Sequence, residues 1–182
     1  MSSVSTSTGC GRRCSTTSEG WLRPVNLRRN PVARRNSDGS YRLLLNKQIR
    51  SALDGLLGEL EDLLFSEPDD PSLARLHPTA YTDDPDRDAE YQLLAGDELR
   101  SKRRQAIDTV RSSLAADELT EAQMWAWLQA LNSLRLVVGT RLDVDDDDGP
   151  VEVEADSPDR GLWEIYEFST QIQGYLVRAL DS

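Results

Sequence analysis

The chain has 182 residues, of which 38% are hydrophobic and 29% are charged, and its formal net charge is −11. This length and balance fit one soluble globular domain with a modest core, and no apolar run reaches the roughly 20 residues of a membrane-spanning helix. The two cysteines, Cys10 and Cys14, lie close together near the start, which excludes a disulfide-stapled secreted fold and makes a reducing cytoplasm the expected compartment.

Residues 1–30 are predicted to form a disordered basic arm, and residues 31–182 a helical domain. Residues 1–20 are rich in Ser, Thr and Gly and show no periodicity, as is typical of disorder. Residues 1–40 hold seven Arg and two acidic residues, whereas the remainder holds 14 basic and 30 acidic residues, so the body would repel nucleic-acid phosphate. An organelle transit peptide and an upstream mis-assigned start codon remain alternatives for the arm.

The first predicted elements are a small hairpin and a long helix. Asp38-Gly39 stands between two short runs, which is a hairpin signal because Gly accepts positive φ. In residues 47–65, Ile and Leu recur at spacings of three and four on one stripe, while Arg50 lies opposite that stripe. Residues 73–78 are expected to form at most one short helical turn.

Residues 87–115 are also predicted to be helical, with a break near Gly96-Asp97. The apolar phase of the first part does not continue into the second part. The second part carries a small basic cluster, Lys102-Arg103-Arg104. A solvated helix face is favoured for this cluster over a nucleic-acid patch because the rest of the body is acidic.

Two further helices complete the predicted fold. Thr120 and Gln123 fit a capping box, in which each side chain bonds the backbone N–H of the other residue, and the helix that follows reaches about Leu142. An acidic loop spans residues 143–160, and the last helix spans about 161–180. We therefore predict an all-α fold, a compact bundle of four to five helices with a small N-terminal β-hairpin.

Most patterns that would indicate catalysis are absent from the sequence. The acidic loop fails the calcium-loop spacing, since aligning Gly149 as the sixth residue puts Ala155 where a bidentate Glu is needed. The single histidine, His77, has no recognisable nucleophile motif or set of metal ligands to work with. There is also no phosphate-binding Gly-rich loop or dinucleotide fingerprint. We therefore predict a protein that is not an enzyme and has no cofactor or metal.

Cys10-Gly11-Arg12-Arg13-Cys14 is the one reactive candidate. The two intervening Arg favour the thiolate, which is the form that reacts with oxidants. Three intervening residues allow the two sulfurs to meet in a flexible chain. The competing interpretation is two inert cysteines in a disordered tail.

The helix after Thr120 is apolar on nearly every side, and Arg135 lies inside its most apolar face. A buried guanidinium without a partner costs several kcal/mol, so we expect a carboxylate from a flanking helix: Glu59, Glu90, Glu98, Glu164 or Glu167. Asn132, Arg135 and Arg141 are predicted to form a buried polar network. Gly139 costs about 1 kcal/mol within a helix, so we expect it to admit another backbone. A small-anion pocket is the functional alternative.

Several segments together resemble an actinobacterial helical family known as a domain of unknown function, whose members are described as oxidative-stress-responsive transcription regulators. The resemblance covers roughly residues 40–180, and the segment from Asn132 to Leu142 is its most specific part. The segments that carry it are Leu73–Tyr81, Ala89–Tyr91, Trp127–Leu136, Gly139–Leu142 and the last helix with Tyr166.

The resemblance implies a cytoplasmic, redox-responsive transcription regulator that works with an RNA polymerase sigma factor or the polymerase itself, with a homodimer as a further implication. Cys10 and Cys14 lie outside the matching region. No helix-turn-helix is recognisable, and the acidic body favours action through a protein partner over direct DNA reading. Two alternatives stay open: a general protein-interaction adaptor, and a small-anion-binding helical domain built around Arg135.

Overall fold

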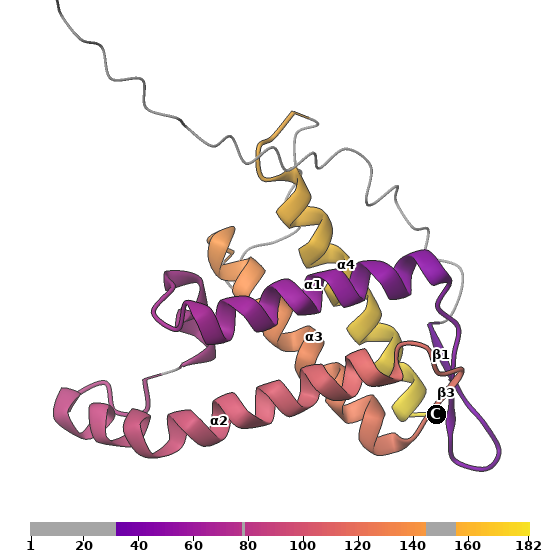
Figure 1. Cartoon of the computed structure of the whole chain (residues 1–182), viewed down its shortest axis with the longest axis horizontal. Coiled ribbons are helices and arrows are strands. Elements are labelled where there is room, and N and C mark those ends of the chain that lie inside the picture. The colour runs from indigo at the N-terminus through magenta and orange to yellow at the C-terminus, as the bar shows by residue number, and fades with distance from the viewer. Residues whose placement is uncertain (1–31, 78, 145–155) are drawn as a thin grey trace, which may run out of the picture.

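The computed structural model describes residues 32–77, 79–144 and 156–182. In these ranges four α-helices pack around a shared core, and a small antiparallel sheet lies at one end of the bundle (Figure 1). This confirms the predicted all-α fold with an N-terminal hairpin. The predicted arm, with Cys10 and Cys14, lies outside the described residues. The elements are β1 (Ala33–Arg35), β2 (Tyr41–Leu43), α1 (Lys47–Ser66), the 3₁₀-helix η2 (Pro71–Leu76), α2 (Pro85–Ser113), β3 (Glu118–Leu119), α3 (Glu121–Arg141) and α4 (Arg160–Leu180).

The hairpin forms where Asp38-Gly39 predicts it, because Gly39 adopts a φ of +85°. Strands β1 and β2 pair antiparallel, and β3 adds a third strand with Tyr41 opposite Leu119. The third strand is absent from the sequence prediction because two residues are too short to show a period of two. Its pairing joins the segment after α2 to the hairpin.

Helix α1 buries its predicted stripe of Ile and Leu, but Arg50 is not a solvent-facing residue. Its side chain is only 17% exposed. The guanidinium donates to the carbonyl oxygens of Leu45 at 3.0 Å, of Ala116 at 2.6 Å and of Leu114. Arg50 therefore ties α1 to carbonyls at and beyond the C-terminal end of α2, where helical carbonyls lack partners of their own.

Helix α2 runs without interruption, so the predicted break near Gly96 is wrong. Asp84 caps its start by accepting from the backbone N–H of Arg87 at 3.1 Å. Just beyond the glycine, Asp97 pairs with Arg100, and Glu98 pairs with Lys102 at 2.6 Å. Such pairs at spacings of three and four each add a few tenths of a kcal/mol to a helix, which helps α2 to tolerate the glycine.

The two halves of α2 differ in packing. The buried apolar side chains described on this helix all lie at Ala106 or beyond. Figure 1 shows the N-terminal part of α2 extending past the rest of the bundle. The change in apolar phase therefore marks where α2 leaves the core rather than where the helix ends.

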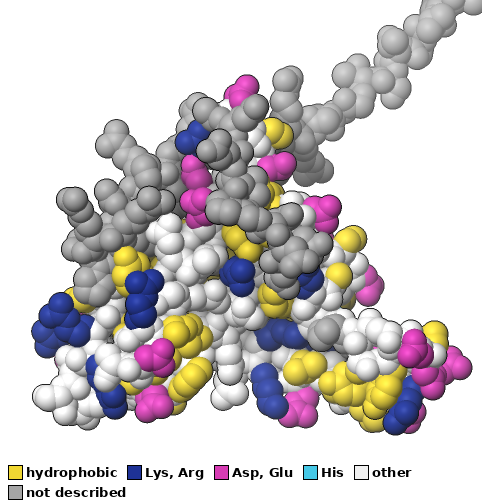
Figure 2. All heavy atoms as spheres, turned by 180° about the vertical axis from the view of Figure 1, so that it is seen from behind, with side chains coloured by type: hydrophobic (Ala, Val, Ile, Leu, Met, Phe, Trp, Pro, Cys, Tyr) yellow, Lys and Arg dark blue, Asp and Glu magenta, His cyan; other side chains and the backbone are white. Residues whose placement is uncertain are grey.

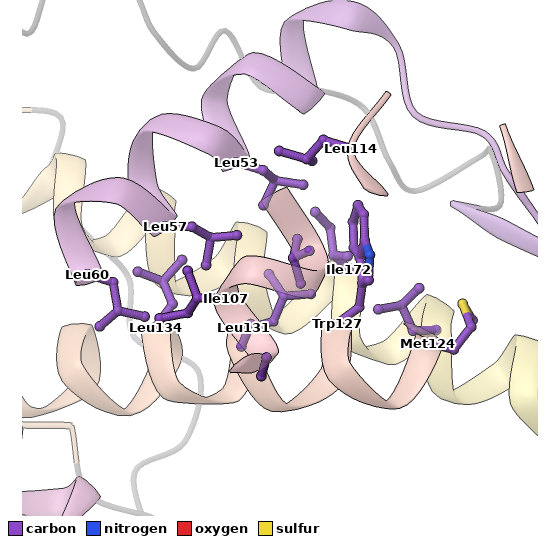
Figure 3. Close-up of a cluster of buried hydrophobic side chains, with 14 of the residues drawn as sticks. Leu53, Leu57, Leu60, Ile107, Leu114, Met124, Trp127, Leu131, Leu134 and Ile172 are labelled. Carbon is purple, nitrogen blue, oxygen red and sulfur yellow. The ribbon is translucent and has the colours of Figure 1, made fainter. Parts of the chain in front are cut away.

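Helix α3 is the central element, as predicted, and packs against α1, α2, η2 and α4. The capping box is confirmed: Thr120 Oγ1 accepts from Gln123 N at 3.3 Å, and Gln123 Oε1 accepts from Thr120 N at 2.8 Å. Trp127 is fully buried, and its indole N–H donates to Ser113 Oγ at 2.9 Å. Figure 3 shows Trp127 and Leu131 on α3 among apolar side chains from the neighbouring helices.

Candidate functional site

Arg135 on α3 meets a tyrosine of α4 instead of a carboxylate. Its Nη2 donates to the Tyr166 hydroxyl at 2.9 Å, and its guanidinium carbon lies 5.1 Å from the centroid of the same ring. Both side chains are half-buried. The contact thus combines a hydrogen bond with a cation–π interaction, and it joins α3 to α4, which contact each other extensively.

The predicted glutamate partner is wrong. Within the described ranges, no carboxylate lies within ion-pair distance of Arg135. Of the five candidates, Glu98 pairs with Lys102 and Glu164 pairs with Arg160. The Arg135 Nε is buried and has no hydrogen-bond partner. A buried donor left in this state costs about 1–3 kcal/mol, and more when the group is charged, so the guanidinium has unused binding capacity.

Gly139, one turn after Arg135, makes room for side chains rather than for a backbone. A Cβ built on Gly139 would lie 3.2 Å from Tyr166 Cε2 and 3.7 Å from Arg75 Nη1. Helix η2 positions Arg75, whose side chain thus reaches the same point on α3 as the tyrosine ring. We refer to Arg75, Arg135, Tyr166 and Gly139 as the arginine–tyrosine cluster.

A further arginine, Arg103, lies beside η2. Its Nη2 donates to the Leu76 carbonyl, while its Nη1 is buried without a hydrogen-bond partner. Burial lowers the pKa of Arg103, and the nearby charge of Arg100 lowers it further. The solvated face predicted for the Lys102–Arg104 cluster holds for Lys102 and Arg104, which are exposed. Arg103 does not belong to that face, because it is half-buried against η2. Figure 2 shows several Lys and Arg side chains, in dark blue, across the middle of one face.

His77 follows η2 and is half-buried near the same arginines. Burial lowers its pKa below the ordinary value, and the charges of Arg103 and Arg100 lower it further. The described residues contain no group of three or more His, Cys, Asp or Glu that could hold a metal ion. At neutral pH His77 is therefore an uncharged neighbour of a positive region.

The other two members of the predicted polar network lie elsewhere. Asn132 and Arg141 are exposed, so they do not form a buried network with Arg135. The charge of Arg141 instead acts on Asp70, whose pKa is lowered mainly by hydrogen bonds from the Ser72 hydroxyl and backbone N–H. Only Arg135 of the three contributes to the arginine–tyrosine cluster.

Comparison with known proteins identifies the family. The model of the family described as a domain of unknown function, DUF2017, matches residues 29–180. The chain belongs to this family. It is also 34% identical to the putative oxidative stress regulator AosR of Mycobacterium leprae, over 94% of this chain and 97% of the relative. The oxidative stress regulator AosR of Mycobacterium tuberculosis H37Rv is 32% identical, over 94% of this chain and 96% of the relative. No solved structure gave a significant match.

These matches confirm the resemblance inferred from the sequence. The names of the relatives describe them as regulators of the response to oxidative stress. Two residues of the arginine–tyrosine cluster, Arg75 and Tyr166, lie in the segments that carry the resemblance, but the sequence alone predicts no role for them. Their hydropathy pattern offers no signal, because each meets Arg135 or Gly139 only through tertiary packing. The one usable signal was Gly139 itself, since glycine within a helix indicates a close neighbour.

None of the described helices is both long enough and apolar enough to cross a membrane.

Proposed function

We propose that this protein is a non-enzymatic, cytoplasmic regulator of the oxidative-stress response that acts by binding the transcription machinery, either RNA polymerase or a sigma factor. The observation that carries the proposal is the similarity to proteins named oxidative stress regulators over 94% of the chain. Because that similarity spans nearly the full length of this chain and of each relative, it supports a shared role for the whole chain. A homodimer is part of the proposal, and sedimentation velocity of the full chain tests it.

Protein contact is favoured over direct DNA contact by the charge of the body. Residues 41–182 hold 30 acidic and 14 basic residues, and such an excess repels DNA phosphate. The exposed N-terminal part of α2 offers a surface for a protein partner. On it Leu94 is 74% exposed and Tyr91 is 39% exposed, and large exposed apolar side chains on an otherwise polar helix are typical of interaction surfaces.

The proposed redox sensor is the pair Cys10 and Cys14 in the basic arm. Peroxide oxidises one thiolate to a sulfenic acid, releasing hydroxide, and the second thiol then forms the disulfide with loss of water. In sum, two thiols and one peroxide become one disulfide and two waters. The neighbouring Arg12 and Arg13 favour the thiolate that starts the reaction.

A pull-down of the full chain from cells, in reducing and in peroxide-treated conditions, tests the proposal. We expect polymerase or a sigma factor to be retained, with the amount depending on the redox state. Replacing both cysteines by Ser should remove that dependence. Non-reducing mass spectrometry should show a Cys10–Cys14 disulfide after peroxide, and its absence contradicts the sensor.

A pair of matched variants tests the surface. Leu94→Ser should reduce the retained partner several-fold because it removes an exposed apolar contact. Leu44→Ser is the control, since Leu44 is also exposed, at 45%, but lies beside the hairpin. Equal retention by both variants contradicts a role for α2. Retention of a stable partner other than polymerase or a sigma factor would favour the alternative of a general adaptor.

A further inference from the structure

Two guanidinium groups approach the same turn of α3 without a carboxylate to neutralise them. Arg75 Nη1 and the Tyr166 ring both lie within 4 Å of the point that a Gly139 Cβ would occupy, and Arg135 is hydrogen-bonded to that tyrosine. Neither arginine has an ion pair within the described ranges. Arg75 is exposed and Arg135 is half-buried, and two neighbouring positive charges without a carboxylate favour the binding of an anion.

We propose that the arginine–tyrosine cluster is a binding site for a single phosphate group, either free phosphate or the phosphate of a small ester. The inference goes beyond the proposed function, because it concerns an effector site on the helical body rather than the cysteine arm or the surface of α2. Arg75, Arg135 and Tyr166 supply its donors, and the absence of a side chain on Gly139 lets the Tyr166 ring and Arg75 approach α3 closely.

The unused donors match this chemistry. In the part of the chain that the structure describes, Arg75 makes no side-chain hydrogen bond, and Arg135 makes only the bond to the Tyr166 oxygen, with its Nε left buried and unpaired. The Tyr166 hydroxyl accepts that bond, and its own proton has no recorded acceptor. The two guanidinium groups and the hydroxyl belong to three elements: Arg75 lies in η2, Arg135 in α3 and Tyr166 in α4. Such donors suit the several oxygens of a tetrahedral anion.

Charge favours a compact phosphate over other anions. A phosphate monoester carries about −1.5 to −2 at neutral pH, which balances two guanidinium groups, whereas one carboxylate balances only one. The body outside this cluster is acidic, so a long polyanion such as DNA would be repelled on either side of the site. The site therefore selects a small dianion.

The test is an NMR titration of the ¹⁵N-labelled full chain that follows the arginine Nε–H signals. The probes are inorganic phosphate and glycerol phosphate, each added at constant ionic strength set with chloride, with acetate as the carboxylate comparison. We expect the Arg135 Nε–H signal to shift and saturate with a phosphate probe. Saturation with both probes supports a phosphate site open to either source, and saturation with glycerol phosphate alone assigns the site to esters.

Variants separate the site from general ion effects. Arg75→Gln should weaken phosphate binding at least about tenfold because one charge-assisted contact is lost, and this exposed residue can be changed without opening the core. Arg42→Gln removes an exposed arginine on β2 and should leave binding unchanged. The proposal is overturned if neither phosphate probe saturates, if Arg75→Gln binds like the wild type, or if acetate binds as tightly as phosphate.

Discussion

Replacing Gly139 by Ala probes the contact between α3 and α4 directly. A Cβ at this position would lie 3.2 Å from Tyr166 Cε2 and 3.7 Å from Tyr166 Cδ2. Ordinary van der Waals contact begins at about 3.5 Å between carbon atoms, so the ring has to move by a few tenths of an ångström. The hydroxyl group on this ring accepts the hydrogen bond from Arg135, so the movement also disturbs the arginine–tyrosine cluster.

Two opposing effects set the magnitude. Alanine raises helix stability over glycine by about 0.5–1 kcal/mol because the unfolded chain loses less conformational freedom. Crowding a packed contact costs about 1–3 kcal/mol. The two contributions together predict that Gly139→Ala ranges from nearly neutral to about 2.5 kcal/mol less stable than the wild type.

Gly55→Ala is the matched control. Gly55 lies within α1, and a Cβ there has no neighbour within 4 Å. This variant has the stabilising effect of alanine in a helix without a steric contact at the new Cβ. It should therefore be about 0.5–1 kcal/mol more stable than the wild type. Urea unfolding, followed by helical circular dichroism, measures both variants. The difference between them isolates the contact with Tyr166.

The same substitution made in a Tyr166→Leu protein tests whether the tyrosine ring causes the difference in stability between Gly139→Ala and Gly55→Ala. In a Tyr166→Leu protein the ring is gone, so adding Gly139→Ala should then cost less than it does in the wild type, and the double-mutant cycle gives the coupling. If Gly139→Ala is as stable as Gly55→Ala in the native background, the close approach of the ring does not limit this position and the reasoning fails.

Three further predictions concern other positions. Arg50→Gln should lower the free energy of unfolding by about 2–3 kcal/mol because charge-assisted bonds to half-buried carbonyls are lost, whereas Arg42→Gln should cost less than about 1 kcal/mol; equal urea midpoints would contradict this. The lowered pKa of His77 means that the unfolded chain binds more protons below about pH 6.5, so stability should rise with pH through that window and His77→Gln should flatten the rise. Asp143 has a φ of +53° after α3, so Asp143→Gly should raise stability by about 0.5–1 kcal/mol, measured as a higher thermal midpoint.

Local signals predicted the helices well because they act over a few residues. The stripe of α1, the hairpin glycine and the Thr120–Gln123 capping box each depend on neighbours within one or two turns, and the structure places all three as expected. The predicted break in α2 was wrong because a change of apolar phase reports what a helix packs against, not whether its hydrogen bonds continue.

The candidate site was only partly predictable. The apolar face around Arg135 showed that this arginine is unusual, and Gly139 indicated a close neighbour. Asn132 and Arg141 share the same helix, yet their exposure places them outside the cluster. A buried guanidinium needs a partner, but burial does not determine the chemistry of that partner, since a tyrosine hydroxyl and ring can replace a carboxylate.

The sequence by itself determined that this protein is a helical bundle with an apolar central helix, an acidic body, and a pair of cysteines near its start. The order of the helices and the arginine within that central helix follow from periodicity and composition alone. Only the tertiary structure decided that Tyr166 and Arg75 converge on Gly139, and that Arg50 binds carbonyls at the end of α2. These contacts join residues distant in sequence, so their geometry arises from how the helices pack and leaves no local pattern.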